Sequence, residues 1–269
     1  MSFKNLGLSE KTIHAIEDLG YQEPTTVQKD VIPSILAGKD IFTIAPTACG
    51  KTCSYIFPLI DIISRREGQN ILIISADSQE AVNISDKLSI FNKYHEINET
   101  TIKDNEDIDS EANVIIASPE LLLENINEEK LDISNINILV VDDINLIKKK
   151  RQLNNLDKIL SLLPANKQNI VFTTRRSKET QDTLNKILKT PAEIKIDKTK
   201  ESETADMAHT ELPTPESAPK YERKNKSDIN SSNPLFDKKA SDLSRRYKVF
   251  GRKIPTFLLT NSTLADETE

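Results

Sequence analysis

The chain has 269 residues, of which 37% are hydrophobic and 5% aromatic, and this composition favours one well-sized hydrophobic core over two. The formal net charge is −6, with 23 Lys and Arg against 29 Asp and Glu in residues 1–196 and 13 of each in residues 197–269. This balance excludes the broad basic surface of a strong non-specific nucleic-acid binder, although a local basic patch is compatible with it. The sequence has no apolar run near the roughly 20 residues that span a bilayer and no apolar signal core, which predicts a soluble, cytoplasmic protein without membrane contacts.

The first 196 residues alternate between helical and strand patterns, as α/β proteins do. One helix is expected from its cap at Ser9 to Leu19, where Gly20 ends it, and a second from Thr25 to Gly38. Several strands, such as ILIIS and ILVV, are apolar on both faces, which predicts a mostly parallel sheet covered by helices on both sides. The expected strands are Asp40–Ile44, Asn70–Ser75, Asn113–Ala117, Asn137–Val141, Asn169–Thr173 and Ala192–Ile196.

The composition changes after residue 196. Residues 197–246 are polar and rich in Pro, Ser and Thr without periodicity, so we expect a disordered linker or tail that is removable without unfolding the domain. Within residues 247–269, the stretch Tyr247–Leu259 is apolar enough to dock on the domain or on a partner. The predicted organisation is therefore a domain over residues 1–196, a polar tail and a short C-terminal segment.

A phosphate-binding loop is predicted where APTACGKT follows a strand and opens a helix. Backbone N–H groups at such a helix start point at phosphates, Lys51 would reach the β and γ phosphates, and the Thr52 hydroxyl would hold Mg²⁺. A plain strand–turn–helix is the alternative interpretation of the same residues. The loop itself comprises Ala45, Thr47, Ala48, Cys49 and Gly50.

A second signal for a nucleotide site is an acidic residue at the end of the apolar run ILVV. Asp142 follows this run, and an acidic residue at the tip of a buried parallel strand is where a P-loop ATPase places its Mg²⁺ carboxylate. An Asp that merely caps the following loop would look the same in sequence. The two motifs together predict a nucleotide and Mg²⁺ as the cofactors, and the family resemblance carried by the next motif implies that the nucleotide is ATP.

The string GYQEPTTVQ, from Gly20 to Gln28, resembles the Q motif of the DEAD-box RNA helicases, and APTACGKT resembles their AxTGxGKT. The resemblance runs from residue 3 to residue 196 and implies a RecA-like P-loop fold. It also implies that Gln28 reads the adenine edge, which suits a side-chain amide with both donor and acceptor groups. Tyr21 is the candidate for the aromatic ring that stacks on the base.

Other motifs of the family are altered in this chain. VVDDIN aligns with VxDEAD, so Asp142 takes the Mg²⁺ position and Asp143 stands where the family has the glutamate that positions the attacking water. Asn145 replaces the last Asp, and FTTR, residues 172–175, resembles FSAT. SADSQEA at residues 75–81 and SPEL at residues 118–121 stand where PTRELA and TPGR each carry an Arg that contacts RNA, and neither contains one.

These departures lead us to expect weak hydrolysis and weak RNA binding. Asp143 is one methylene shorter than Glu, and Ala48 replaces a glycine that the family uses in the loop. Three hypotheses follow: a helicase domain that works with a protein partner supplying a second RecA-like domain, a pseudo-helicase that acts as a protein-binding module, and a small P-loop kinase or other NTPase. The Q-motif string argues against the third.

Overall fold

The computed structural model describes residues 2–66, 68–104, 108–109 and 111–196. The tail predicted for residues 197–246 and the docking segment predicted for residues 247–269 lie outside these residues, so the boundary at residue 196 stays a prediction. No helix within the described ranges is long and apolar enough to cross a membrane.

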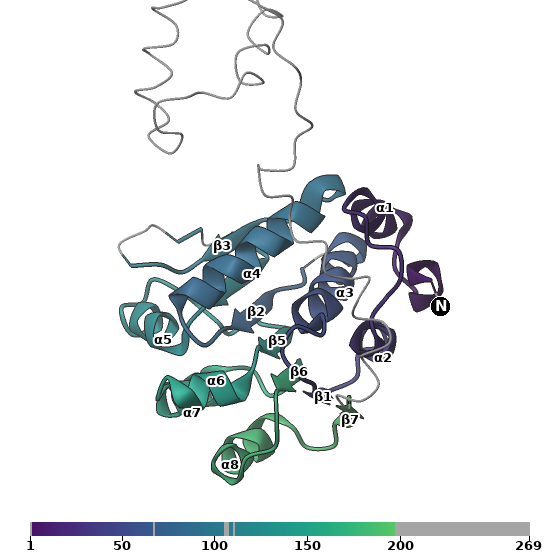
Figure 1. Cartoon of the computed structure of the whole chain (residues 1–269). Helices are drawn as coiled ribbons and strands as arrows, with labels where there is room; N and C mark the ends of the chain where they lie inside the picture. Colours follow the sequence, from purple (N-terminus) through teal and green to yellow (C-terminus); the bar gives the residue numbers. More distant parts are fainter. Residues whose placement is uncertain (1, 67, 105–107, 110, 197–269) are drawn as a thin grey trace, which may run out of the picture. The chain divides into compact units, whose positions relative to one another are not determined.

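The described residues form a seven-stranded parallel sheet with the strand order β3-β4-β2-β5-β6-β1-β7 (Figure 1). All six strands predicted from the sequence are confirmed. The sequence analysis missed β3, a short and partly polar strand at one edge of the described sheet that pairs with β4. The strands are β1 Ile41–Ile44, β2 Ile71–Ile74, β3 Glu99–Thr101, β4 Val114–Ala117, β5 Ile138–Val141, β6 Gln168–Thr173 and β7 Ala192–Lys195.

Helices cover both faces of the sheet (Figure 1). One face carries η1 Phe3–Leu6, α1 Glu10–Asp18, α2 Thr26–Leu36, α3 Lys51–Arg65, α4 Ser78–Phe91 and η2 Asn92–Tyr94. The other face carries α5 Pro119–Asn127, α6 Ile144–Lys149, α7 Leu153–Leu162 and α8 Lys178–Ile187. The first two helices begin at the predicted caps, because the Ser9 hydroxyl accepts from Thr12 N and Thr25 forms a capping box with Gln28.

Each central strand contributes side chains to two separate hydrophobic clusters. Ile71 and Ile73 of β2 pack with α1 to α4, whereas Leu72 and Ile74 pack with the helices of the other face. Successive residues of a strand point to opposite faces, so a strand covered on both sides must be apolar throughout. The arrangement confirms the predicted α/β fold, and it places the carboxyl ends of β1, β5 and β6 next to one another.

A buried carboxylate anchors the N-terminal segment on α3. Asp61 is 0% exposed; its Oδ1 accepts from Ser9 Oγ at 2.6 Å and from Thr12 Oγ1. Its Oδ2 accepts from Ser9 N at 2.6 Å and from Arg65 Nη2 at 2.8 Å. A buried charge is tolerated only when it is paired and hydrogen-bonded. The network therefore holds the start of α1 against the helix that opens with the P-loop.

His95 completes this network, and its environment leads us to expect that the stability of the domain depends on pH. Its Nε2 lies 3.1 Å from Thr12 Oγ1 and its Nδ1 lies 2.7 Å from Ser64 Oγ. Burial lowers the pKa of His95 below its usual value; Asp61 opposes this shift and Lys11 adds to it. Because the unfolded chain binds the proton more tightly, the free energy of unfolding should decrease as the pH falls below about 6.5.

Urea denaturation at pH 7.5 and pH 5.5 measures this effect. We expect His95→Gln to reduce the difference in unfolding free energy between the two pH values, because the glutamine does not titrate. His14→Gln, at an exposed position, is the control and should keep the wild-type difference. A wild-type pH difference that survives unchanged in His95→Gln would rule out His95 as its source.

Candidate functional site

The loop between β1 and α3 has the geometry of an anion-binding site. Ala48 and Gly50 both adopt left-handed backbone conformations, with φ of +63° and +87°. Gly50 is the N-cap of α3, and no side chain among the described residues caps this helix. The first N–H groups of α3 are therefore available to a ligand, and the helix dipole favours a negative charge at this end.

The Q-motif residues contact the P-loop directly. Thr25 Oγ1 donates to the carbonyl of Cys49 at 3.0 Å, and Gln28 Nε2 donates to the carbonyl of Gly50 at 3.4 Å. Gln28 Oε1 also accepts from Thr25 N at 3.0 Å, and the residue is 2% exposed. A Cβ at Gly50 would lie 2.7 Å from Gln28 Nε2. The structure thus brings Gln28 to the loop and adds Thr25, whose capping signature the sequence carried without revealing its contact with Cys49.

Tyr21 lies away from these contacts. Its ring packs against Phe91 of α4, with the ring centroids 6.0 Å apart. It is 39% exposed, and burial of the remainder raises the pKa of its hydroxyl. The aromatic contact of Tyr21 is therefore with α4, whereas Gln28 and Thr25 contact the P-loop.

Lys51 bridges the P-loop and the end of β5. Its Nζ lies 3.3 Å from the carbonyl oxygen of Ala45 and 3.4 Å from Asp143 Oδ2. The side chains of Lys51 and Asp143 are 11% and 5% exposed, so water screens this ion pair only weakly. Asp143 also caps α6, because its Oδ1 accepts from Asn145 N at 3.2 Å. Both carboxylate oxygens of Asp143 are therefore already bonded.

Asp142 lies beside this pair and is contacted by Tyr55 of α3. The Tyr55 hydroxyl donates to Asp142 Oδ2 at 3.3 Å, and Tyr55 is fully buried. Burial raises the pKa of Asp142 to about 6, while the nearby ammonium of Lys51 acts in the opposite direction. Sequence reasoning missed Tyr55. The available signal was its position three residues after Thr52, which places both on one side of α3.

Asn145 connects the end of β5 with the end of β6. Its Nδ2 donates to Thr173 Oγ1 and to the carbonyl of Arg175, both at 2.7 Å. Thr173 Oγ1 in turn donates to the same Arg175 carbonyl at 2.8 Å. The VVDDIN and FTTR segments are therefore joined through a neutral amide.

The turn between α6 and α7 contacts the two segments that lack the RNA-binding Arg residues. Lys150 Nζ lies 2.6 Å from Asp77 Oδ2 in SADSQEA, and Gln152 Nε2 donates to Glu120 Oε2 in SPEL at 2.9 Å. Leu121, which stands where TPGR has its Arg, is 8% exposed and belongs to the hydrophobic core. That position therefore supports packing, and no cation reaches solvent from it.

Ala48 occupies a conformation that suits glycine, and we expect Ala48→Gly to stabilise the domain by about 0.5–1 kcal/mol. Urea denaturation of both proteins measures the change. Ala37→Gly is the control, because Ala37 has a φ of −77° and glycine only adds entropy to the unfolded chain there. A loss of stability at position 48, or an equal gain at both positions, would show that the left-handed φ of Ala48 carries no strain.

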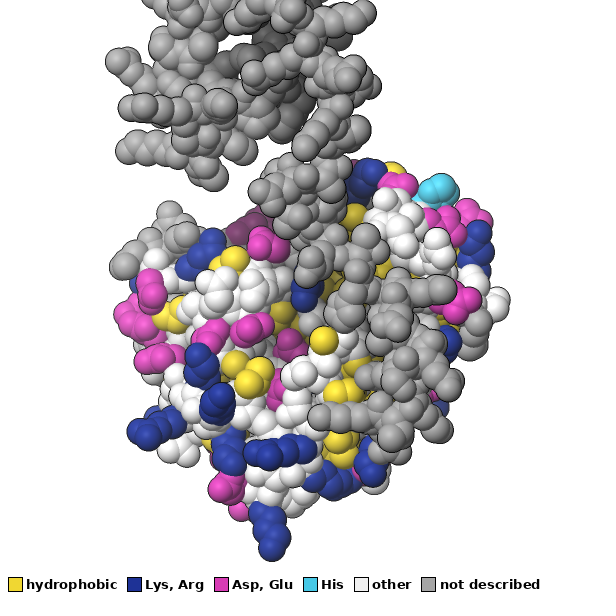
Figure 2. Space-filling model, in the orientation of Figure 1, with side chains coloured by type: hydrophobic (Ala, Val, Ile, Leu, Met, Phe, Trp, Pro, Cys, Tyr) yellow, Lys and Arg dark blue, Asp and Glu magenta, His cyan; other side chains and the backbone are white. Residues whose placement is uncertain are grey.

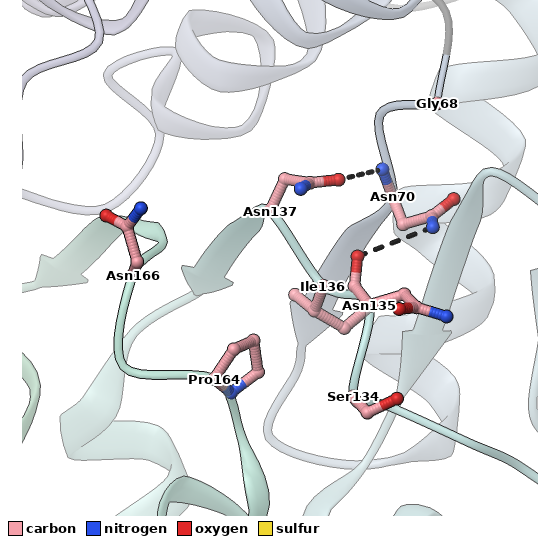
Figure 3. Close-up of a pocket in the computed structure, with 8 residues that line it drawn as sticks. All are labelled: Gly68, Asn70, Ser134, Asn135, Ile136, Asn137, Pro164 and Asn166. Carbon is pink, nitrogen blue, oxygen red and sulfur yellow. Dashed lines mark hydrogen bonds between the residues drawn. The ribbon is translucent and has the colours of Figure 1, made fainter.

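A separate polar cavity of about 300 Å³ lies at the amino ends of the central strands, opposite the end that carries the P-loop (Figure 3). Its walls come from the segments that precede β2, β5 and β6, and Asn137 Oδ1 accepts from Asn70 N at 2.9 Å in its wall. The lining residues are Gly68, Asn70, Ser134, Asn135, Ile136, Asn137, Pro164 and Asn166. Ligands of open α/β sheets bind at the carboxyl ends of the strands, so this cavity is not part of the nucleotide site.

The comparisons with known proteins agree with this geometry. A model of the DEAD/DEAH box helicase family matches residues 25–184. The chain is 25% identical over 205 residues to the ATP-dependent RNA helicase DeaD of Haemophilus influenzae, and the match covers 73% of this chain and 33% of that protein.

Two solved structures show the same fold. The crystal structure of a DEAD box protein from Methanococcus jannaschii matches with a TM-score of 0.69 at 23% identity, over 73% of this chain and 56% of that one. A hypothetical ATP-dependent RNA helicase from Sulfolobus tokodaii matches with a TM-score of 0.65 at 20% identity, over 70% of this chain and 57% of that one. The chain thus spans about a third of the length of DeaD and somewhat over half of these structures.

Proposed function

Because the chain belongs to the DEAD/DEAH box helicase family and its described residues form the RecA-like fold, we propose that this domain binds an adenine nucleotide together with Mg²⁺. The observation that carries the proposal is the uncapped start of α3, with Lys51 held between the Ala45 carbonyl and Asp143. Free amides and a poorly screened ammonium at one helix end suit the phosphates of a nucleotide.

Each residue has a separate task in this proposal. The amides of residues 47–51 and the ammonium of Lys51 bind the phosphates, and Thr52 and Asp142 would hold Mg²⁺, which neutralises phosphate charge when it is bound. The donor set fits such an ion, because a hydroxyl and a carboxylate are the oxygen ligands that Mg²⁺ prefers. Bound Mg²⁺ would also favour the charged form of Asp142, whose pKa burial raises.

Gln28 is proposed to select adenine. A side-chain amide has two hydrogens and two lone pairs, and the contacts with Gly50 and Thr25 use one of each. The Nε2 contact of 3.4 Å is long for a hydrogen bond and is therefore easily exchanged for one to a base. One donor and one acceptor on the same amide match the N7 acceptor and N6 donor of adenine, whereas the same edge of guanine presents two acceptors, N7 and O6.

Isothermal titration calorimetry with Mg-ATP and Mg-GTP tests this function. We expect ATP to bind at least about tenfold more tightly than GTP, and Lys51→Ala to weaken ATP binding roughly 10- to 100-fold, the loss expected for hydrogen bonds to a charged group. Lys39→Ala, at an exposed position, is the matched control and should bind as the wild type does. Equal affinity for the two nucleotides, or full affinity in Lys51→Ala, would contradict the proposal.

Hydrolysis and RNA unwinding are proposed to need a second RecA-like domain, which in the family supplies the arginine fingers. The described residues form one such domain, and a protein partner is one source of the second. The alternative function is a pseudo-helicase that binds another protein. The bonded state of Asp143, whose two oxygens contact Lys51 and Asn145 N, favours this alternative. ATP hydrolysis restored by an added second domain would exclude the pseudo-helicase.

A further inference from the structure

Tyr55 is a buried side chain of α3 that has no task in the proposed function. It lies three residues after Thr52, on the helix that opens with the P-loop, and it is 0% exposed. Its ring packs against Phe172 of β6, with the ring centroids 5.4 Å apart. Both rings belong to the hydrophobic cluster that α1 to α4 form with the sheet. The ring of Tyr55 is thus explained by packing, whereas its hydroxyl is a polar group within that packing.

The Tyr55 hydroxyl is bonded to the residue that follows β5. It donates to Asp142 Oδ2 at 3.3 Å. A phenol keeps its proton at neutral pH, so it acts as the donor toward a carboxylate. Burial of a hydroxyl costs free energy unless it is hydrogen-bonded, and phenylalanine would fill the same space without that cost. The hydroxyl is therefore explained by its contact with Asp142 and not by the core.

This contact leaves one oxygen of Asp142 for a metal ion. Oδ2 accepts from Tyr55, and no described residue donates a hydrogen bond to Oδ1. Asp142 is partly exposed, so an ion can reach it. The neighbouring Asp143 differs, because its two oxygens contact Lys51 and the backbone of Asn145.

The same pair of groups occurs a second time, at the surface. Figure 2 shows Asp and Glu side chains spread over the visible face of the domain, where water competes for them. One exposed carboxylate, Asp18, also accepts a hydrogen bond from a tyrosine, the exposed Tyr94. The chain therefore offers one tyrosine–aspartate contact at the nucleotide site and a matched one in solvent.

We propose that Tyr55 is a positioning residue for the metal ion: its hydroxyl holds Oδ2 of Asp142, so that Asp142 binds Mg²⁺ through Oδ1 alone. A hydrogen-bond donor to a metal-binding carboxylate fixes the orientation of that carboxylate, and its loss weakens metal binding. The inference rests on the proposed binding of a nucleotide with Mg²⁺, and it names the residue that sets the metal preference of this site.

Binding through one oxygen favours Mg²⁺ over Ca²⁺. Mg²⁺ requires a small octahedral set of ligands, which one or two carboxylates and the phosphates of a substrate supply together with water. Ca²⁺ takes about six to eight oxygens, and carboxylates can bind it through both of theirs. Because Tyr55 occupies Oδ2, Asp142 offers the number of ligands that suits the smaller ion. Removal of the hydroxyl would free Oδ2 and relax this preference.

Isothermal titration calorimetry with Mg-ATP, with Ca-ATP and with ATP in EDTA tests the proposal. Tyr55→Phe removes the hydroxyl and retains the ring. We expect it to weaken the binding of Mg-ATP by about tenfold, at the lower end of the loss for a partner of a metal ligand, because the contact is long. The affinities for Ca-ATP and for metal-free ATP should not fall. A loss confined to Mg-ATP separates positioning of the ion from a general disturbance of the site.

Tyr94→Phe is the matched control, because it removes a hydroxyl that donates to an exposed carboxylate. It should bind all three ligands as the wild type does, and thermal unfolding checks that both variants are folded. Tyr55→Phe that binds Mg-ATP with wild-type affinity, or that loses all three ligands alike, would overturn the proposal. So would a wild type that binds Mg-ATP and Ca-ATP equally well, a result that needs no variant.

A double-mutant cycle shows whether Tyr55 acts through Asp142. In the background of Asp142→Asn, Tyr55→Phe should cause no further loss of Mg-ATP affinity, since the carboxylate that it positions is gone. Losses that add in the double variant would contradict this dependence. A wild type that binds ATP under none of the three conditions would instead overturn the proposed nucleotide function, so the two failures are distinguishable.

Discussion

Purified protein of residues 1–269 is expected to unwind no duplex RNA and to hydrolyse ATP at least about a thousandfold more slowly than a two-domain DEAD-box helicase assayed beside it, because an arginine finger is worth roughly 10³–10⁵ in rate. The described residues form one RecA-like domain, and the arginine fingers implied by the resemblance to the family would come from a second one. RNA should not stimulate the residual rate. A phosphate-release assay and a strand-displacement assay, each with and without RNA, measure both activities.

The second cause of slow hydrolysis is local and can be tested by itself. Asp143 is shorter than the glutamate of the family, and its two oxygens already contact Lys51 Nζ and Asn145 N. Misplacing a catalytic group by about 1 Å can cost on the order of 100-fold. Asp143→Glu should therefore raise the basal rate slightly and leave unwinding at zero. Multi-turnover unwinding by the wild-type chain alone would show that one domain, or a homodimer of it, is sufficient.

Replacing Asp61 with alanine is expected to destabilise the domain by about 3–5 kcal/mol, the cost of breaking a buried charged network by removing one partner. The carboxylate is 0% exposed and accepts from Ser9, Thr12 and Arg65. Its loss leaves buried donors without an acceptor and releases the start of α1 from α3. Urea denaturation followed by circular dichroism gives the change in unfolding free energy.

Two variants make this result interpretable. Asp18→Ala removes an exposed carboxylate that pairs with Lys93 at 2.6 Å, and it should change the stability only slightly, as the loss of a surface ion pair does. Asp61→Asn retains the shape and part of the hydrogen bonding, so we expect a loss between those of the two alanine variants. Asp61→Ala with the stability of Asp18→Ala would show that α1 does not depend on the network.

Local sequence determined most of the fold, because its signals act within a few residues. The strands β1, β2, β4 and β5 are each buried on both faces and, apart from Thr43 of β1, apolar, as is typical of a sheet covered on both sides. The caps at Ser9 and Thr25 marked the first two helices, and the GKT after a strand located the P-loop. Ala48, which aligns with a glycine of the family, has a positive φ in the structure.

The partners of the site residues were decided by tertiary structure, since they depend on which distant segments lie side by side. The sequence alone does not show that Thr25 and Gln28 contact the carbonyls of Cys49 and Gly50, or that Tyr21 packs on Phe91. β3 was not predicted because it is short and partly polar, so its own sequence carries no strand pattern. Its extended conformation comes from pairing with β4 at the edge of the sheet.

The distribution of charge shows most clearly the difference between what the sequence determines and what the tertiary structure decides. Counting Lys and Arg against Asp and Glu over residues 1–196 gives an acidic domain, and this count argues against a broad basic surface while leaving a local basic patch open. The fold places residues 148–151 beside residues 175–178 and pairs only some of their cations with carboxylates. Electrostatic potential depends on the distances between charges and falls off over about 10 Å in salt, so the position of each charge matters more than the total. The sequence by itself determined the net charge, and only the folded chain decided where that charge is presented.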